Sequence, residues 1–156
     1  MASTGRARVP RGKRLVLIAA GLVLFLAISG LLARFLSTEN LERDDVLALL
    51  QAEVSGNEQE MLARLSGCRA QPKCVTVVKT DAASIRRTGS VKILSLTSST
   101  AYSLTGATGI TRAAWTVIGH LPTVQCVEVK RTGNFLTGVS VALLSIGAPI
   151  SNEADC

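Results

Sequence analysis

Histidine and aromatic residues are scarce in this chain of 156 residues. It contains one histidine, one tryptophan, one tyrosine and three phenylalanines. Proteins that bind single-stranded nucleic acids usually stack the bases on aromatic side chains. The shortage of such side chains argues against a nucleic-acid-binding protein.

The chain also lacks the short motifs of common catalytic and nucleotide-binding sites. No GxSxG, P-loop or GxGxxG pattern occurs. No CxxC pair occurs either, and the spacing of the four cysteines, with His120 as the one histidine, is not that of a zinc site. We therefore expect no cofactor, no metal ion and no catalytic residue, and we favour a protein without enzymatic activity.

Acidic residues are absent from the first 36 positions, and this absence explains the net charge. Residues 1–14 carry a charge of +5 and residues 15–36 carry +1, whereas residues 37–156 contain 11 basic and 11 acidic residues. The formal net charge of +6 is thus confined to the start of the chain. Binding to a phosphate backbone usually needs a basic surface. The neutral remainder gives a second reason to expect no nucleic-acid partner.

A long apolar run occupies residues 15–36, and it is uncharged from Leu15 to Ala33. As a helix these 19 residues would span about 28 Å, close to the roughly 30 Å hydrocarbon thickness of a bilayer. The run predicts a transmembrane helix that contacts the lipid bilayer. It divides the chain into a basic cytoplasmic tail, 1–14, the helix, 15–36, and an extracytoplasmic domain, 37–156.

The basic residues before the run predict its orientation. Positive charges that flank a transmembrane helix tend to stay in the cytoplasm. We therefore predict a single-pass protein of the cell membrane with its C-terminus outside. The alternative is a signal peptide cleaved near Ser29, which is less favoured because apolar residues continue to Leu36. The predicted topology signal consists of Arg6, Arg8, Arg11, Lys13 and Arg14.

All four cysteines lie in the predicted extracytoplasmic part. An even number of cysteines in an exported domain indicates disulfide bonds. Three pairings are possible. We favour Cys68–Cys74, which would close a short loop containing Pro72, and Cys126–Cys156, which would hold the end of the chain.

Apolar spacing in residues 37–156 predicts helices followed by strands. Ser37 and Thr38 can cap a new helix over residues 40–54, which Gly56 ends. Asn57 and Glu60 resemble a capping box for a second helix over 58–66. Residues 73–87 fit a helix better than a strand. Four antiparallel strands are expected over 91–103, 110–119, 122–131 and 135–146.

This order predicts an α+β fold, in which two or three helices pack on one face of a four-stranded antiparallel meander. Tyr102, Trp115 and Glu128 are candidates for the wall of a cavity between the two layers. If the cavity were catalytic, Asp81 and His120 would be further candidates for its acid and base groups. A local basic patch, able to meet anionic headgroups or cell-wall polymers, is a further hypothesis; it would contain Arg86, Arg87, Lys92, Arg112, Lys130 and Arg131.

The order of elements resembles the NTF2-like (cystatin-like) superfamily. The resemblance rests on the helical stretch 40–65 and on the strand sequences VKILSLTSS, TRAAWTVIG, TVQCVEVKR and VSVALLSI, and it covers residues 40–148 in architecture. The small bacterial single-pass members are most similar, including Mce-associated proteins and inner-membrane scaffolds of type IV secretion. The resemblance implies a scaffold role, and it carries over no functional residue. Enzymatic members place acid and base side chains in a cavity, whereas few such residues occur in these strands.

The expected function is therefore that of a membrane-anchored binding or scaffold module with a protein partner at the outer face of the membrane. One alternative is a secreted module that binds a small ligand or a protein after cleavage near Ser29. A second alternative is an NTF2-like enzyme with a catalytic cavity.

Overall fold

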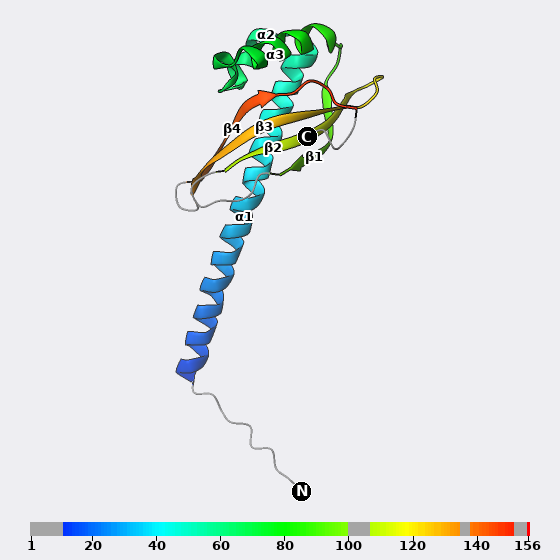
Figure 1. Ribbon diagram of the computed structural model, residues 1–156. Helices are drawn as coiled ribbons and strands as arrows, with labels where there is room; N and C mark the ends of the chain where they lie inside the picture. The colour runs from blue at the N-terminus through cyan, green and yellow to red at the C-terminus, as the bar shows by residue number, and fades with distance from the viewer. Residues whose placement is uncertain (1–10, 100–106, 135–137, 152–155) are drawn as a thin grey trace. The chain divides into compact units, whose positions relative to one another are not determined.

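The computed structural model describes residues 11–99, 107–134, 138–151 and 156. It is an α+β protein with a four-stranded antiparallel sheet (Figure 1). The chain divides into two units, residues 1–37 and residues 38–156. The elements are α1 (Arg11–Ser55), α2 (Glu58–Arg64), the short 3-10 helix η1 (Cys68–Ala70), α3 (Pro72–Ser84), β1 (Val91–Ser98), β2 (Ala107–Val117), β3 (Thr123–Asn134) and β4 (Gly138–Ile146).

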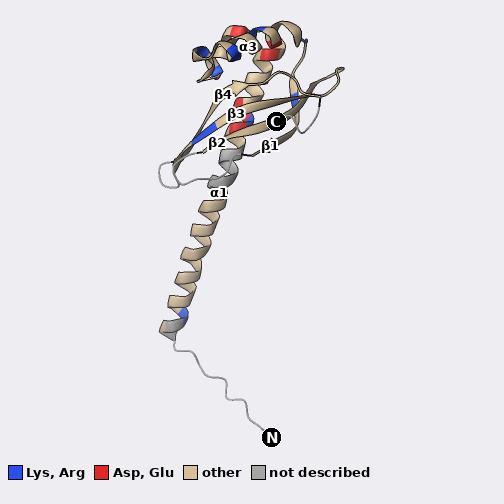
Figure 2. Cartoon of the chain, viewed as in Figure 1, with Lys and Arg blue, Asp and Glu red and all other residues tan. Residues whose placement is uncertain are grey.

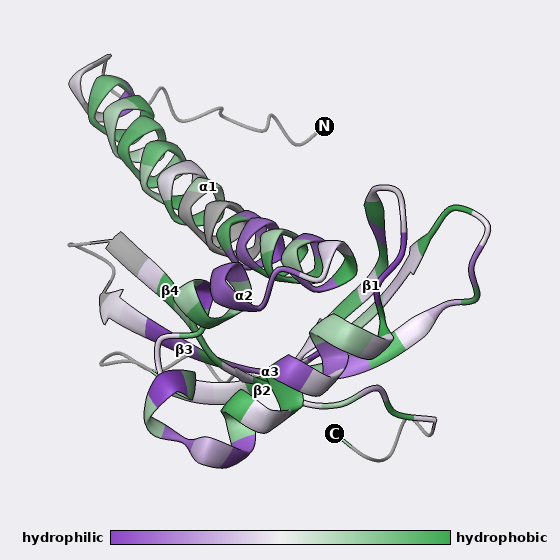
Figure 3. Cartoon of the chain, turned by 90° about the horizontal axis from the view of Figure 1, so that it is seen from above, coloured by the Kyte–Doolittle hydropathy of each residue, from purple (hydrophilic) through white to green (hydrophobic). Residues whose placement is uncertain are grey.

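The first unit contains the apolar part of α1. The segment Arg14–Ala33 is long and apolar enough to cross a membrane, with a mean hydropathy of 2.8, and none of it is buried in protein. Apolar residues surround this part of the helix (Figure 3), and almost no charge interrupts it (Figure 2). A helix that is apolar on all sides needs an apolar environment.

The prediction of a separate helix that begins at Ser37 or Thr38 is wrong. The backbone of α1 is helical without interruption from Arg11 to Ser55. Residues 34–41 contain neither glycine nor proline, so nothing in the sequence ends the helix there. Ser and Thr cap a helix only where the residues before them leave it.

The end of α1 and the start of α2 follow the predicted signals. Gly56 has a φ of 72°, the left-handed conformation that commonly ends a helix. Asn57 then caps α2, because the backbone N–H of Glu60 donates to Asn57 Oδ1 at 3.1 Å. In return, the carboxylate of Glu60 accepts a hydrogen bond from the side-chain amide of Asn57. The helix predicted over residues 73–87 is confirmed as α3, which has Pro72 in its first turn and ends at Ser84, three residues before the predicted boundary.

The four strands lie in the order β1-β2-β3-β4, and each pair is antiparallel. The observed strands end a few residues from the predicted boundaries. Strand β2 stops at Val117 rather than at residue 119, because Gly119 adopts a φ of 83° in the turn. It begins earlier than predicted, at Ala107, which pairs with Arg131. The meander itself is as predicted.

The helices of the second unit cover one face of the sheet, as predicted. The part of α1 after residue 38 buries its apolar stripe, and α3 packs on the same face, because residues of both helices contact Gln125 in β3. Alternate residues of β2 and β3 are buried there. The largest fully buried apolar side chains of this core are Trp115, Leu49, Leu50, Met61 and Leu65.

Two disulfide bonds join the predicted pairs. Cys68 is bonded to Cys74, which ties η1 to α3, and Cys126 is bonded to Cys156, which ties the end of the chain to β3. Before it reaches Cys156, the chain runs back along β3. Gly147 donates its backbone N–H to the carbonyl of Cys126, and Ile150 donates to that of Val124.

Candidate functional site

A chain of polar side chains crosses the core between the sheet and the helices. The indole N–H of Trp115 donates to Gln125 Oε1 at 2.8 Å. The amide nitrogen of Gln125 donates to Glu53 Oε1 of α1 at 2.7 Å, and it lies 3.5 Å from Asp81 Oδ2 of α3. All four side chains are buried. Because an indole only donates and a carboxylate accepts, this arrangement fixes the orientation of the Gln125 amide.

Burial raises the pKa of both carboxyl groups of this cluster. The pKa of Glu53 rises from 4.5 to about 7, and that of Asp81 rises from 3.8 to about 6. The main cause in each case is removal of the charged form from water, and for Glu53 the charge of Asp81 adds to the increase. The hydrogen bond from Gln125 opposes this increase, and for Glu53 the charge of Arg87 also opposes it.

These shifts predict that the second unit is less stable at pH 8 than at pH 5. Below the unfolded pKa of 4.5 Glu53 is protonated in both states. As the pH rises toward the folded value of about 7, the unfolded chain loses its proton first, so the free energy of unfolding falls. We expect a loss of roughly 3 kcal/mol across this window. Urea unfolding of the full-length chain in detergent, followed by fluorescence, measures it.

Glu53→Gln is the control for this pH dependence. A glutamine keeps an oxygen that can accept the hydrogen bond from Gln125, but it has no proton to lose. The variant should therefore be markedly less pH-dependent than the native chain, with Asp81 supplying the remaining change. Equal stability of the native chain at pH 5 and pH 8 would contradict the raised pKa values.

Arg87 lies at the edge of this cluster, on the connection between α3 and β1. Its guanidinium carbon lies 5.5 Å from the centre of the Trp115 ring, a cation–π geometry. Two buried polar atoms in this region have no hydrogen-bond partner among the described residues, namely Arg87 Nη1 and Glu53 Oε2. The charge of Arg87 thus acts on Glu53 without a direct hydrogen bond between them.

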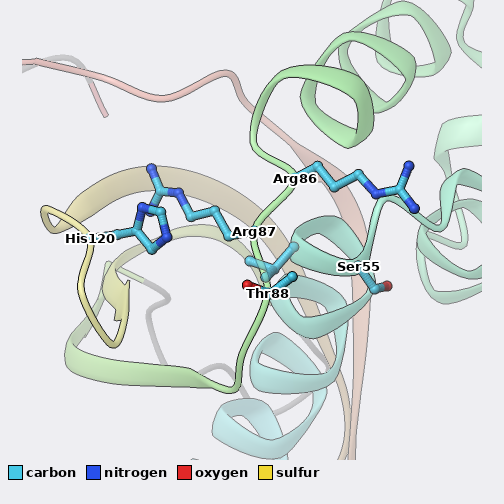
Figure 4. Close-up of a pocket in the computed structure, with 6 residues that line it drawn as sticks. Ser55, Arg86, Arg87, Thr88 and His120 are labelled. Atoms are coloured by element: carbon cyan, nitrogen blue, oxygen red, sulfur yellow. The ribbon is translucent and has the colours of Figure 1, made fainter.

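An open pocket with a volume of about 520 Å³ adjoins Arg87. It lies where the end of α1, the connection before β1 and the turn between β2 and β3 meet (Figure 4). Figure 4 shows the guanidinium of Arg87 directed toward His120, whereas the side chain of Arg86 points the opposite way, past Ser55. The pocket is lined by Val54, Ser55, Arg86, Arg87, Thr88 and His120.

Backbone contacts hold the connection that carries the two arginines. The N–H of Arg87 donates to the carbonyl of Val54 at 2.9 Å. The side chain of Gln51 accepts from the N–H of Val91 and donates to the carbonyl of Gly89. Gly89 has a φ of 133°, and a Cβ there would lie 2.8 Å from Val117. These contacts hold this wall of the pocket in place, and none of them involves an arginine side chain.

A second polar cluster links the start of the domain to the sheet. Arg131 of β3 donates through Nε and Nη2 to the carboxylate of Glu42 in α1, at 2.9 Å for Nε. Thr111 of β2 donates to the other carboxylate oxygen. Ser98 of β1 accepts a hydrogen bond from Arg131, and its hydroxyl oxygen lies 3.1 Å from that of Thr111. Glu42 is 1% exposed, so this ion pair is internal.

The predicted cavity residues do not form one cavity. Trp115 is fully buried under the helices. Glu128 lies on the other face of the sheet, since it pairs with half-exposed Ile110 and accepts a hydrogen bond from Ser145. Tyr102 lies outside the described residues. The prediction that Trp115 and Glu128 share a cavity wall is therefore wrong.

The acid and base candidates are separated as well. Asp81 is buried beside Gln125, and His120 lines the open pocket at the β2–β3 turn. With Glu128 on the opposite face, these three side chains do not converge on one site. Among the described residues, no group of three histidine, cysteine or carboxylate side chains could hold a metal ion.

The predicted basic patch divides into three parts. Arg131 is buried in its ion pair with Glu42, so it does not belong to a surface patch. Arg86 and Arg87 line the open pocket. The remaining members, Lys92, Arg112 and Lys130, alternate with buried residues and lie on the sheet face away from the helices.

The residues of the predicted topology signal are described only in part. Arg14 is exposed at the start of the apolar segment. The backbone of Arg11 and Lys13 is helical, whereas Arg6 and Arg8 lie outside the described residues.

Sequence reasoning missed the polar residues that organise the core. Glu42 and Glu53 lie on the same helical stripe as Val46 and Leu49, at spacings of three, four and seven residues. Gln125 alternates in phase with Val127 in β3. A charged or amide residue in register with an apolar stripe is a signal that could have identified all three.

No protein-family model, curated protein or solved structure matches this chain. The function is therefore inferred from the apolar segment of α1, the two disulfide bonds and the open pocket beside Arg87.

Proposed function

We propose that this chain is a single-pass membrane protein whose second unit, residues 38–156, is a binding module outside the cytoplasm. The observation that carries the proposal is the segment Arg14–Ala33, of which no part is buried in protein. An apolar helix of this length that lacks a protein cover is suited to a lipid bilayer. The five basic residues before or at its start favour a cytoplasmic N-terminus.

The two disulfide bonds support an extracytoplasmic location for the second unit. Disulfides form and persist in oxidising compartments and are rare in the cytosol. Both bonds lie in the second unit. The proposed topology places this unit on the side where the bonds would be stable.

A binding or scaffold role is favoured over catalysis by the arrangement of the polar groups. The carboxyl groups of Glu42, Glu53 and Asp81 are enclosed in the core. The open pocket is lined instead by two arginines, a histidine and two hydroxyl groups. Such groups bind an anion readily. The α+β architecture is compatible with the resemblance to the NTF2-like superfamily, and that resemblance implies a scaffold role.

Membrane retention tests this proposal. The intact full-length mass should remain in the membrane fraction after an alkaline wash, because the apolar segment stays in the bilayer. Replacing Leu22 and Leu26 by lysine should release most of the protein, since each charge at the centre of a span costs about 3 kcal/mol. Mass spectrometry of the washed membranes measures both outcomes.

Leu94→Lys with Ile118→Lys is the matched control. These two side chains are also exposed apolar residues, but they lie in the second unit. The control should stay in the membrane fraction. A soluble product that begins at Gly30 would instead support the secreted alternative and reject the anchor.

A further inference from the structure

The pocket beside Arg87 has the chemistry of an anion-binding site. Arg87 and His120 supply nitrogen donors, and Thr88 supplies a hydroxyl group. Arg86 and Ser55 also line the pocket, but the Arg86 side chain points away from Arg87, and the Ser55 hydroxyl donates to the carbonyl of Ala52. No acidic side chain is among the described residues that line it. Guanidinium groups pair well with carboxylates and form strong, charge-assisted hydrogen bonds with them.

Arg87 is held in position for such a partner. The guanidinium carbon of Arg87 lies 5.5 Å from the centre of the Trp115 ring. The backbone N–H of Arg87 donates a hydrogen bond to the carbonyl of Val54, which fixes the backbone at this residue. Its Nη1 has no hydrogen-bond partner in the described part of the chain. A buried donor without a partner is costly and calls for a specific explanation. A ligand anion in the adjoining pocket can supply an acceptor for this guanidinium.

Two large apolar side chains flank His120 on the same turn. Ile118 is 91% exposed and Leu121 is 85% exposed, the highest values among the large apolar residues that the structure describes. The turn itself is ordered, because His120 donates its N–H to the carbonyl of Val117 and accepts a hydrogen bond from Thr116. Exposed apolar side chains grouped at one place indicate an interaction surface.

The pocket lies at the end of the second unit opposite to the point where the chain joins it. The unit begins at Thr38, and Ser55 lies 17 residues farther along α1. At a rise of about 1.5 Å per residue this separation is roughly 26 Å. A partner can therefore reach the pocket and the turn without contacting the start of the unit.

We propose that this pocket binds an acidic and apolar segment of a partner protein. A carboxylate of the segment pairs with Arg87 and His120, and a neighbouring apolar side chain packs on Ile118 and Leu121. The proposal rests on the binding role proposed above and names the chemistry of the partner. Charge complementarity selects the carboxylate, and the adjoining apolar turn selects a peptide segment over a free inorganic anion.

Peptide binding to the full-length chain in neutral detergent tests the proposal. The probes are a short capped peptide that alternates leucine with glutamate and the same peptide with glutamine in place of glutamate. Trp115 is the single tryptophan of the chain and lies against Arg87, so its fluorescence reports on the pocket. The glutamate peptide should change this fluorescence and bind at least about tenfold more tightly than the glutamine peptide.

Variants locate the bound peptide. Arg87→Gln and His120→Ala should each weaken binding of the glutamate peptide by about tenfold, and Leu121→Ser should weaken it severalfold. Arg69→Gln removes the same charge from an exposed position on η1 and should have no effect. His120 and Leu121 are exposed on a turn, so their variants keep the test valid if Arg87→Gln does not fold.

The peptide measurements can overturn the proposal in three ways. These are equal binding of both peptides, equal weakening by Arg69→Gln, or no binding measured by calorimetry. The last measurement is binding of the chain and its pocket variants to vesicles of an anionic phospholipid. If the pocket variants weaken vesicle binding but leave peptide binding unchanged, the site is a lipid-headgroup site instead. Failure of peptide binding in a chain that stays in the membrane rejects this inference alone, whereas peptide binding by a soluble product rejects only the anchor.

Discussion

Arg131→Met is expected to lower the free energy of unfolding of the second unit by about 3–5 kcal/mol, because it leaves the carboxylate of Glu42 buried without its cation. Glu42 is 1% exposed, and in this variant Thr111 still donates a hydrogen bond to its carboxylate. The resulting loss should lower the melting temperature of the full-length chain in detergent by roughly 10–20 °C. Circular dichroism measures the change.

The double variant Glu42→Met with Arg131→Met separates loss of the pair from loss of packing. Apolar residues of similar size remove both charges at once, and such replacements are often neutral or stabilising. We expect the double variant to recover most of the stability that the single variant loses. Lys130→Met is the neighbouring control, because Lys130 is exposed on the other face of the sheet. A single variant that melts like the native chain would show that the ion pair contributes nothing.

Local signals in the sequence were sufficient to predict much of the fold. Gly56 and Asn57 mark the boundary between α1 and α2, and the alternation in VQCVEV marks a strand with one buried face. Spacing also favoured the correct cysteine pairs, since Cys68 and Cys74 are separated by six positions. These features depend on neighbours in the chain, which is why one sequence reveals them.

The polar clusters depend instead on distant parts of the chain. Glu42 and Arg131 are 89 positions apart, and Glu53 and Gln125 are 72 apart. Periodicity could show that each side chain points into the core, but not which partner it meets. The error over Glu128 has the same origin, because its face depends on the register in which it pairs with Ile110. A change of one residue in that register would reverse its face.

Reducing both disulfide bonds is expected to lower the free energy of unfolding by about 6 kcal/mol in the loop-entropy model. The bond between Cys126 and Cys156 closes the longer loop, with a separation of 30 positions, and contributes about 3.7 kcal/mol of this total. The bond between Cys68 and Cys74 spans 6 positions and contributes about 2.4 kcal/mol. Melting of the full-length chain with and without reductant measures the sum, and an unchanged curve would contradict both bonds.

Variants that remove one disulfide bond at a time should differ in tryptophan fluorescence as well as in the loss of stability. Replacing Cys126 and Cys156 by serine releases the end of the chain, in which the carbonyl of Gly147 lies 3.3 Å from the amide nitrogen of Gln125. Gln125 also accepts a hydrogen bond from the indole of Trp115. Loss of the disulfide bond between Cys126 and Cys156 should therefore change the tryptophan fluorescence of the folded protein. Replacing Cys68 and Cys74 by alanine should lower stability with little change in that fluorescence, since these residues join η1 to α3. Equal spectra for both variants would show that the tail does not support the buried cluster.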